Sequence, residues 1–448
     1  MKPRIAIVHD YLNQYGGAER VVEVLHELFP DAPVFTSLYN PQVMPAHYRA
    51  WDIRTTWMRF LPGTRRWFRL YFWLYPLAFE TLDVRAYDVI ITSSSAYAKG
   101  IRPAPGAVQI CYCHTPMRWA WRTEEYVARE GIGRWGRQLL QPFLALLRRW
   151  DRGTAARVDT FIANSHEVAG RIRRVYGREA EVIPPPVDLP PFHMPVPPED
   201  FYLTGGRLVP YKRIDLAIRA CNALKLPLVV FGDGRDRAQL EALAGPTVRF
   251  VGRVDEATLH DLYRRCRAYI TAAEEDAGIQ PVEAIAAGRP VIALAAGGVL
   301  ETVIEGVTGR FFHAQTAAAL AVALAQSRAD TWDAQRIAEH AQQWRRERFA
   351  ERILAAIQRT QAGVSRASGA AGDAAVFSQA RKQDDGNADD ADWRDWNGWR
   401  LEDWSWRCYG WCVCLNSICV HLHPSVYTIR PPSVPICVHL WIDEYLTY

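Results

Sequence analysis

The chain has 448 residues, too many for one ordinary hydrophobic core, so we expect two domains and additional segments. Its 49% hydrophobic and 23% charged residues are typical of a globular protein, and a net charge of +4 is too small to favour a nucleic-acid partner. No run of about 18 apolar residues predicts a membrane-spanning helix, and the N-terminus lacks the length and apolar centre of a signal peptide. The first 360 residues contain four cysteines, which suits a reducing cytoplasm: Cys111, Cys113, Cys221 and Cys266.

Strand-like and helix-like segments alternate twice along the chain. In the first half, a short apolar run is followed by two glycines and a periodic helix from Ala18 to Phe29. A proline-rich segment, 183–191, then predicts a stiff linker, after which the alternation restarts. The candidate strands are 4–9, 34–36, 89–92, 108–112 and 160–163, and then 201–204, 228–231, 248–251, 268–271 and 291–294. This order predicts an α/β protein with two doubly wound, Rossmann-like domains, whose ligands bind at the carboxyl ends of the strands in a cleft between the domains.

The last segment has a different composition. Residues 364–392 are rich in Ala, Ser, Asp and Gln, which predicts disorder. Residues 393–448 carry seven of the 17 tryptophans and five of the nine cysteines. The residues there that could ligate a metal are Cys412, Cys414, His421 and His423. Their spacing matches no zinc pattern, so we predict no metal site; a read-through or shifted-frame tail is the alternative, and we assign the segment no function.

The most informative stretch is a pair of glutamates, Glu275 and Glu283, that flank the start of a helix. Pro281 suits the first helical position and Gly288 suits the stop. A helix N-terminus attracts anions, whereas glutamates beside it accept hydrogen bonds from hydroxyls and repel phosphate. The pattern therefore favours sugar hydroxyls that flank a phosphate, as in a nucleotide sugar. The alternative is a first-turn Glu283 that only favours the helix dipole.

A basic motif, Thr204 to Arg213, precedes this pair. We expect a strand to end at Thr204, glycines to open the turn, and Lys212 to begin a helix. Arg207 and Lys212 would then lie near the carboxyl end of the strand, where a guanidinium and an ammonium suit phosphate oxygens. The alternative is two solvated basic residues.

Gly16 and Gly17 follow the first strand and would let the backbone approach a ligand at a helix N-terminus. The spacing is not G-x-G-x-x-G, so a dinucleotide fingerprint is not supported, and an ordinary loop is the alternative.

Polar residues also follow other strands of the first half. His114 lies with Thr115 and Arg118 beyond an apolar strand, where a histidine can bind a sugar hydroxyl or support developing charge. A structural histidine is the alternative. Residues 92–99 and 164–166 place polar side chains at two further strand ends, although Asn-Ser also serves as a helix cap.

Together these motifs resemble the retaining GT-B glycosyltransferases of family 4, from about residue 4 to residue 361. The two glutamates with seven residues between them are the family's most recognised motif, and the companions are Gly-Arg207 with Lys212, Gly16-Gly17, Asn164-Ser165 and 186–188. Residues 348–353 resemble the family's closing helix. The sequences of segments 16–20, 113–118 and 275–279 resemble those of bacterial mannosyltransferases that assemble surface polysaccharides, including lipopolysaccharide. One departure is Ala277, because the family usually has Phe there, so the sugar pocket is expected to be altered.

The resemblance implies a role for each site residue. Arg207 and Lys212 would hold the donor diphosphate, Gly16 and Gly17 would close on it, and His114 would face the reacting sugar. Glu283 would bind the ribose, and the transferred sugar would be held by Glu275 with the backbone of Asp276, Ala277, Gly278 and Ile279. No metal and no cofactor besides the nucleotide sugar is implied. Retaining transfer would proceed by front-side attack, with the leaving phosphate accepting the proton of the acceptor.

The resemblance implies an N-terminal acceptor-side domain over 1–185, a linker over 186–198, a nucleotide-sugar domain over 199–345, a closing helix over 346–362 and the tail 363–448. We expect transfer of a hexose, mannose from GDP-mannose, to a saccharide acceptor linked to a polyprenyl lipid. The alternatives are a UDP-sugar transferase or epimerase and, because of Ala277, a non-catalytic protein that binds nucleotide sugars.

Two segments of the first half would suit a lipid-linked acceptor. Residues 67–79 are rich in aromatic side chains, and 134–151 forms a basic helix. Aromatics flanked by arginines favour a membrane interface, so we expect a cytoplasmic protein that contacts the inner face of the cytoplasmic membrane. The alternative is two helices that pack on each other within the domain.

Overall fold

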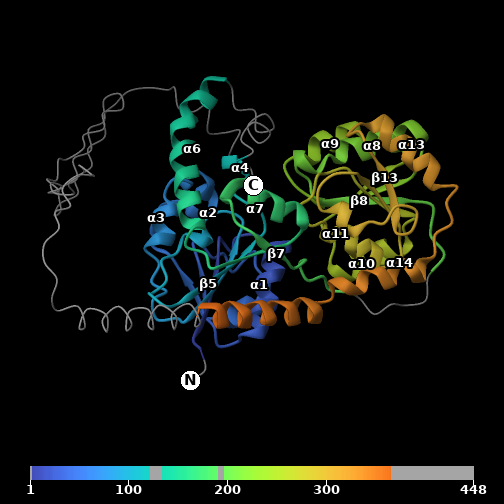
Figure 1. Ribbon diagram of the computed structural model, residues 1–448. Coiled ribbons are helices and arrows are strands. Elements are labelled where there is room, and N and C mark those ends of the chain that lie inside the picture. The colour runs from blue at the N-terminus through green and yellow to red at the C-terminus, as the bar shows by residue number, and fades with distance from the viewer. Residues whose placement is uncertain (1–2, 122–133, 190–195, 365–448) are drawn as a thin grey trace, which may run out of the picture. The chain divides into compact units, whose positions relative to one another are not determined.

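The computed structural model describes residues 3–121, 134–189 and 196–364 (Figure 1). The predictions for the tail, both the disordered segment and the metal ligands considered there, lie outside the described residues, as does part of the linker. Both sheets described below belong to one compact unit, residues 1–368. Among the described residues, no helix combines the length and hydrophobicity needed to cross a bilayer.

The first sheet has seven parallel strands in the order β3-β2-β1-β4-β5-β6-β7. The strands are β1 Ile5–His9, β2 Val34–Thr36, β3 Ile53–Thr55, β4 Val89–Ser94, β5 Val108–Cys113, β6 Thr160–Ala163 and β7 Ala180–Val182. The five predicted strands are confirmed, whereas β3 and β7 were not predicted, because both are short edge strands with a charged residue at their centre. The order reverses between β1 and β4, so a crevice is expected beyond the carboxyl ends of these two strands.

The second sheet has six parallel strands in the order β10-β9-β8-β11-β12-β13. The strands are β8 Tyr202–Arg207, β9 Leu228–Asp233, β10 Val248–Gly252, β11 Ala268–Thr271, β12 Val291–Leu294 and β13 Gly309–Phe312. Five of them were predicted, and the edge strand β13 was not. Here the order reverses between β8 and β11, which places the corresponding crevice where Arg207 ends β8 and the loop to Glu275 leaves β11.

Helices cover both faces of each sheet (Figure 1). Along the first sheet they are α1 Gly17–Leu28, α2 Thr64–Trp67, α3 Tyr75–Glu80, α4 Arg118–Trp121, α6 Arg134–Ala155 and α7 His166–Tyr176, with the short 3-10 helices η1 Ala46–Ala50, η2 Trp57–Phe60, η3 Phe68–Tyr71 and η4 Ala98–Gly100. Along the second they are α8 Ile214–Leu224, α9 Arg237–Leu243, α10 Glu256–Arg265, α11 Ile279–Ala286, α12 Val299–Thr302, α13 Ala317–Ser327 and α14 Ala334–His340, with η5 Pro210–Lys212 and η6 Ala341–Trp344. The central strands are buried along their whole length, which explains their continuous apolar runs.

A last helix, residues 346–364, returns from the second sheet to the first. Its apolar side chains Phe349, Ile353 and Ile357 are buried in the same core as strands β1, β4 and β5. The end of the chain's second half is therefore held by the core of its first half.

Three local predictions were wrong. The strand before the basic motif does not end at Thr204, because Gly205 and Gly206 continue β8 and pair with β9 as far as Arg207. Lys212 does not begin a helix; it ends η5, and Arg213 follows in the left-handed region at φ 52° before α8 starts.

The third correction concerns the helix between the glutamates. Gly278 caps α11 in the left-handed region, at φ 67°, so Pro281 is the third helical residue and not the first. It still lies in the first turn, where its missing N–H breaks no hydrogen bond. Glu283 consequently lies in the second turn, while Gly288, at φ 75°, follows the end of the helix as predicted.

Candidate active site

Lys212 and Glu275 form a partly buried ion pair at the carboxyl edge of the second sheet. Lys212 Nζ lies 2.6 Å from Glu275 Oε1 and donates a second hydrogen bond to Gln280 at 3.1 Å. Burial disfavours both charges, but each charge stabilises the other more strongly, so the pKa of Lys212 is raised and the pKa of Glu275 is lowered. Both groups are therefore charged at neutral pH and available to a ligand with anionic and hydroxyl parts.

Arg207 lies nearby and is more exposed. Its guanidinium makes two long contacts within the part of the chain that the structure describes, 3.3 Å to Gln14 Oε1 and 3.5 Å to the Tyr211 hydroxyl. A ligand phosphate could replace these contacts at little cost, because neither partner is charged.

Glu283 is buried and both of its carboxylate oxygens have partners. Arg20 Nη1 lies 2.6 Å from Oε1, and the Tyr263 hydroxyl donates to Oε2 at 3.0 Å. Arg20 lies on α1, so this pair joins the first half of the chain to the second. The simpler interpretation of Glu283, a solvated group that only favours the helix dipole, is wrong, because the side chain is only 7% exposed and ion-paired.

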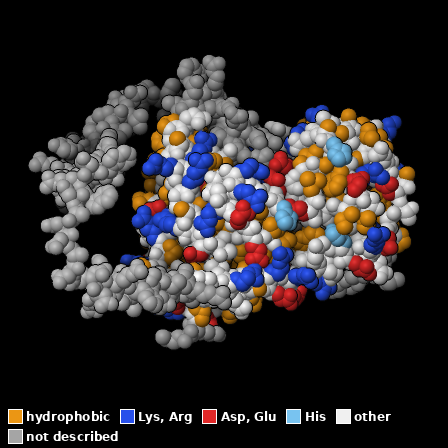
Figure 2. Space-filling model, in the orientation of Figure 1, with side chains coloured by type: hydrophobic (Ala, Val, Ile, Leu, Met, Phe, Trp, Pro, Cys, Tyr) orange, Lys and Arg blue, Asp and Glu red, His pale blue; other side chains and the backbone are white. Residues whose placement is uncertain are grey.

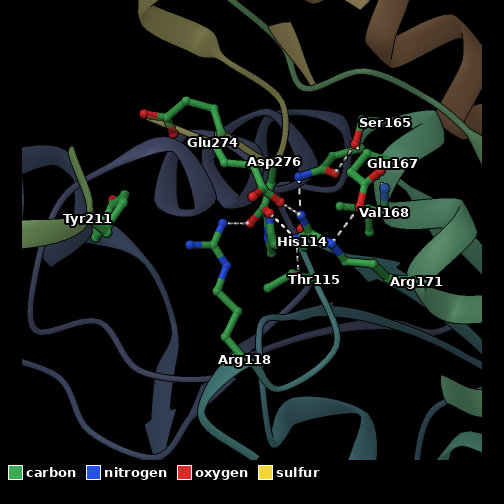
Figure 3. A network of polar contacts seen from close by, with 12 residues as sticks. His114, Thr115, Arg118, Ser165, Glu167, Val168, Arg171, Tyr211, Glu274 and Asp276 are labelled. Atoms are coloured by element: carbon green, nitrogen blue, oxygen red, sulfur yellow. Dashed lines mark hydrogen bonds and ion pairs between the residues drawn. The ribbon is translucent and has the colours of Figure 1, made fainter. Parts of the chain in front are cut away.

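Asp276 bridges the two halves through its side chain (Figure 3). Its two oxygens pair with Arg118 on α4 and with Arg171 on α7. Arg171 also contacts Glu274 at 3.1 Å. The sequence motif predicts a role only for the backbone of Asp276; in the fold its carboxylate positions the loop between β11 and α11 against the first half.

Gly17 and Ile279 meet where the first turns of α1 and α11 approach each other. A Cβ on Gly17 would lie 2.5 Å from Ile279 Cδ1, so a larger residue at this position would have to displace the end of the Ile279 side chain. Gly16 precedes α1 in extended backbone and offers no side-chain cap, which leaves the first N–H groups of α1 free of a capping side chain. Gly17 therefore lies next to Ile279 in the fold, while its predicted contact with a donor diphosphate stays a prediction.

His114 directly follows β5, with its ring 9% exposed. Its Nε2 lies 2.8 Å from the Ser93 hydroxyl, and its carbonyl accepts a hydrogen bond from Asn164. Burial and the charge of nearby His9 lower the pKa of His114 to about 3, so the ring is neutral at physiological pH. Such a ring can bind a hydroxyl but is a weak general base.

The polar side chains that follow the other strands of the first sheet have different roles. Ser165 accepts a hydrogen bond from the Val168 N–H at 3.2 Å, so it caps α7, as the alternative interpretation stated. Ser93 contacts His114, whereas Lys99 is buried against Asp151 and does not line a crevice. Among the described residues, no group of three or more His, Cys, Asp or Glu side chains is arranged to hold a metal ion.

Ser93 belongs to the polar segment 92–99 that the sequence analysis had singled out, but four residues of this arrangement had been given no role: His9, Arg20, Arg171 and Tyr263. Arg20 has a sequence signal, since it lies three residues after Gly17 in the segment 16–20 that carries the resemblance. Arg171 and Tyr263 lie within helices, where an arginine or tyrosine has no distinguishing local pattern.

Comparisons with known proteins cover most of the described chain. The profile of Glycosyltransferase Family 4 matches residues 15–190, and that of Glycosyl transferases group 1 matches residues 193–344. A D-inositol 3-phosphate glycosyltransferase of Catenulispora acidiphila is 31% identical over an alignment of 185 positions that covers 34% of this chain and 43% of that protein. A GDP-mannose-dependent alpha-mannosyltransferase of Mycolicibacterium smegmatis is 39% identical over 106 residues, 23% of this chain and 28% of that protein.

The match to each of these two curated relatives therefore spans less than half of that relative's length. The structure of HepE from Anabaena, solved with UDP and glucose, superimposes with a TM-score of 0.56 at 18% identity and covers 80% of this chain and 99% of its own. At this identity the likeness concerns the fold, which in both proteins consists of two Rossmann-like halves.

Proposed function

Because the chain belongs to glycosyltransferase family 4 and has its two-sheet GT-B fold, we propose that it is a retaining enzyme that transfers a hexose from a nucleotide sugar to a saccharide. The main observation in support of this function is that four charged side chains lie around the first turns of α11, with Gly17 facing that helix: Arg207, Lys212, Glu275 and Glu283. Two cations together with two carboxylates suit a diphosphate flanked by a sugar and a ribose.

The roles we propose are those that the resemblance implies, and these contacts support them. Arg207 and Lys212 hold the diphosphate, with the free N–H groups that follow Gly16 and Gly17 closing on it. The transferred sugar is held by hydrogen bonds to Glu275 and to the backbone of residues 276–279, which include Asp276, Gly278 and Ile279. Glu283 binds the ribose hydroxyls, and for this it must release or share Arg20, which occupies Oε1.

The chemical step needs stabilisation of a departing diphosphate, which is mainly an electrostatic task. Arg207, Lys212 and the N-terminus of α11 supply positive potential where that charge develops. In a front-side attack the departing phosphate oxygen accepts the acceptor's proton, so no further basic side chain is required. The contacts between the two halves would exclude water, which limits hydrolysis of the donor.

We propose GDP-mannose as the donor. The mannosyltransferase relative and the local sequences around Gly16 and Glu275 support this choice. Thermal denaturation with GDP-mannose, UDP-glucose and related donors tests this choice, because a ligand at a hundred times its Kd stabilises the folded state by about 2.7 kcal/mol. Stabilisation by UDP-sugars alone would overturn the choice of donor and favour the UDP-sugar alternative.

The catalytic assignment is tested by Lys212→Ala and Glu275→Ala. Both should abolish transfer while the protein stays folded, because each removes a charged group from the centre of the site. Arg219→Ala is the matched control, since Arg219 is an exposed cation on neighbouring α8. Full activity in either site variant would contradict the assignment. Donor binding without transfer in the unmodified protein would favour the non-catalytic alternative that Ala277 keeps open.

We further propose that the acceptor is lipid-linked and that the first half contacts the inner face of the cytoplasmic membrane. The inward faces of residues 67–79 and of α6 pack into one core, as the alternative interpretation stated. Their outward faces still expose large apolar side chains, namely Trp67, Leu70, Trp73, Leu77, Phe143 and Leu146. Exposed Arg69, Arg149 and Arg152 accompany them, and Figure 2 shows basic and hydrophobic side chains interspersed over this part of the surface.

Flotation with anionic liposomes at low salt tests this surface. The protein should float with the vesicles, and Trp73→Glu combined with Leu146→Glu should abolish flotation. Val322→Glu is the control, because Val322 is equally exposed but lies on α13 of the second sheet. Failure of the unmodified protein to float would refute membrane contact.

A further inference from the structure

A row of buried polar side chains connects His114 to the interior of the first sheet. Glu19 lies on α1, His9 ends β1, and Ser93 lies near the end of β4. His9 Nε2 lies 3.5 Å from Glu19 Oε1, His9 Nδ1 lies 3.1 Å from both the carbonyl and the hydroxyl of Ser93, and that hydroxyl lies 2.8 Å from His114 Nε2. Glu19, His9 and Ser93 are each at most 2% exposed. The row crosses the reversal of strand order between β1 and β4.

The partners of His9 determine where its protons lie. A backbone carbonyl only accepts hydrogen bonds, so His9 Nδ1 carries the proton directed at Ser93, and Nε2, when protonated, faces the Glu19 carboxylate. Burial opposes this charged form, but Glu19 and neighbouring Asp10 outweigh it, so the pKa of His9 is raised. His9 therefore binds its second proton more readily than a free imidazole does.

The Ser93 hydroxyl transmits this arrangement to His114. Its oxygen receives the Nδ1–H of His9, and its single proton is left to donate to His114 Nε2. The proton of a neutral His114 must then reside on Nδ1. Within residues 3–121, 134–189 and 196–364, no group forms a hydrogen bond with Nδ1.

We propose that Glu19, His9 and Ser93 are positioning residues that hold His114 in its neutral Nδ1–H form and present that N–H to a hydroxyl of the transferred hexose. The second part of this inference rests on the proposed function. A neutral donor can orient a hydroxyl without transferring a proton to it or competing with the cations at the diphosphate. A fixed tautomer also means that no rearrangement is needed when the sugar binds.

Nitrogen NMR of the ¹⁵N-histidine-labelled protein tests the tautomer without any substrate. The resonances of His114 are identified by their loss in His114→Gln. We expect Nδ1 protonated and Nε2 unprotonated at pH 7, and loss of this single form in Ser93→Ala. Ser94→Ala is the matched control, because Ser94 is a buried serine on the same strand whose hydroxyl does not contact the ring. An Nε2–H tautomer, or a Ser93→Ala spectrum unchanged at His114, would overturn the proposal.

Glu19→Gln tests the origin of the arrangement. Without the carboxylate, His9 should lose its second proton near neutral pH, and the pKa of His114 should rise because the neighbouring positive charge disappears. Glu27→Gln, an exposed glutamate on the same helix, should leave both histidines unchanged. Identical histidine titrations in Glu19→Gln and the unmodified protein would contradict the proposed role of Glu19.

Kinetics with the accepted donor tests the link to the sugar. Ser93→Ala should lower kcat by about tenfold with little change in the KM of the acceptor, the size expected for one lost hydrogen bond in the transition state. Transfer that proceeds normally in Ser93→Ala refutes the sugar contact, even if the tautomer is as proposed. If NMR shows the expected tautomer but the unmodified protein transfers no sugar, the positioning role of Glu19, His9 and Ser93 stands and the proposed function is overturned.

Discussion

The buried ion pair of Lys99 and Asp151 provides a stringent test of how the first half is stabilised. Lys99 is 1% exposed and Asp151 is fully buried; the lysine also donates to the Ala96 carbonyl at 2.9 Å. Asp151 Oδ2 accepts hydrogen bonds from the Trp121 indole at 2.7 Å and the Tyr176 hydroxyl at 2.8 Å. Lys99→Met would leave Oδ1 charged, buried and without its cation.

The expected cost follows from these contacts. Removing one partner of a buried ion pair destabilises a protein by about 3–5 kcal/mol. We expect the lower end, about 3 kcal/mol, because the Trp121 and Tyr176 hydrogen bonds to Asp151 remain. With a urea dependence of about 3 kcal/mol per M, the unfolding midpoint should fall by about 1 M.

Urea denaturation followed by tryptophan fluorescence measures this shift. Lys99→Met combined with Asp151→Asn should recover much of the loss, since the buried charge is then gone. Arg85→Ala, which breaks an exposed pair with Asp83, should leave the midpoint unchanged. A shift in Lys99→Met no larger than that of Arg85→Ala would refute the reasoning.

Three further predictions concern the site. The raised pKa of His9 implies a contribution to stability that is complete below about pH 6.5 and is lost as the pH rises through the pKa of His9 in the folded protein. The pKa of about 3 for His114 implies the opposite: a contribution that is present above about pH 6.5 and is lost as the pH falls below it. In melting temperatures measured from acid to alkaline pH, His9→Gln should therefore remove the alkaline decline and His114→Gln the acid decline. Gly17→Val should raise the donor KM at least about tenfold, because its side chain would collide with Ile279; an unchanged KM in steady-state assays would be evidence against close approach of the two helices. Glu283→Gln should lower kcat/KM by about 10- to 100-fold with the natural donor and much less with a donor that lacks the ribose hydroxyls, and equal losses with both would dissociate Glu283 from the ribose.

Both sheets could be predicted from local sequence because their central strands are buried on both faces. Such strands are continuous apolar runs, as in 89–92 and 291–294, and they stand out without any tertiary information. The edge strands β3, β7 and β13 did not stand out, because they are short and contain charged residues. Gly205 and Gly206 were misassigned to a turn for a related reason: glycine is common in turns, and only pairing with β9 shows that they continue a strand.

The sequence by itself determined which side chains lie beyond the carboxyl ends of the strands, since a side chain that directly follows a parallel strand must lie at that edge. This holds for His114, which directly follows β5; Arg207 is the last residue of β8 itself, and Glu275 and Glu283 lie in the loop and helix after β11, so their place at the site needed the fold. Only the tertiary structure decided their partners: that Glu283 pairs with Arg20 from 263 positions away, and that His114 is bonded to Ser93. Those contacts depend on how helices and loops distant in sequence pack around two sheets, and no local pattern encodes that packing.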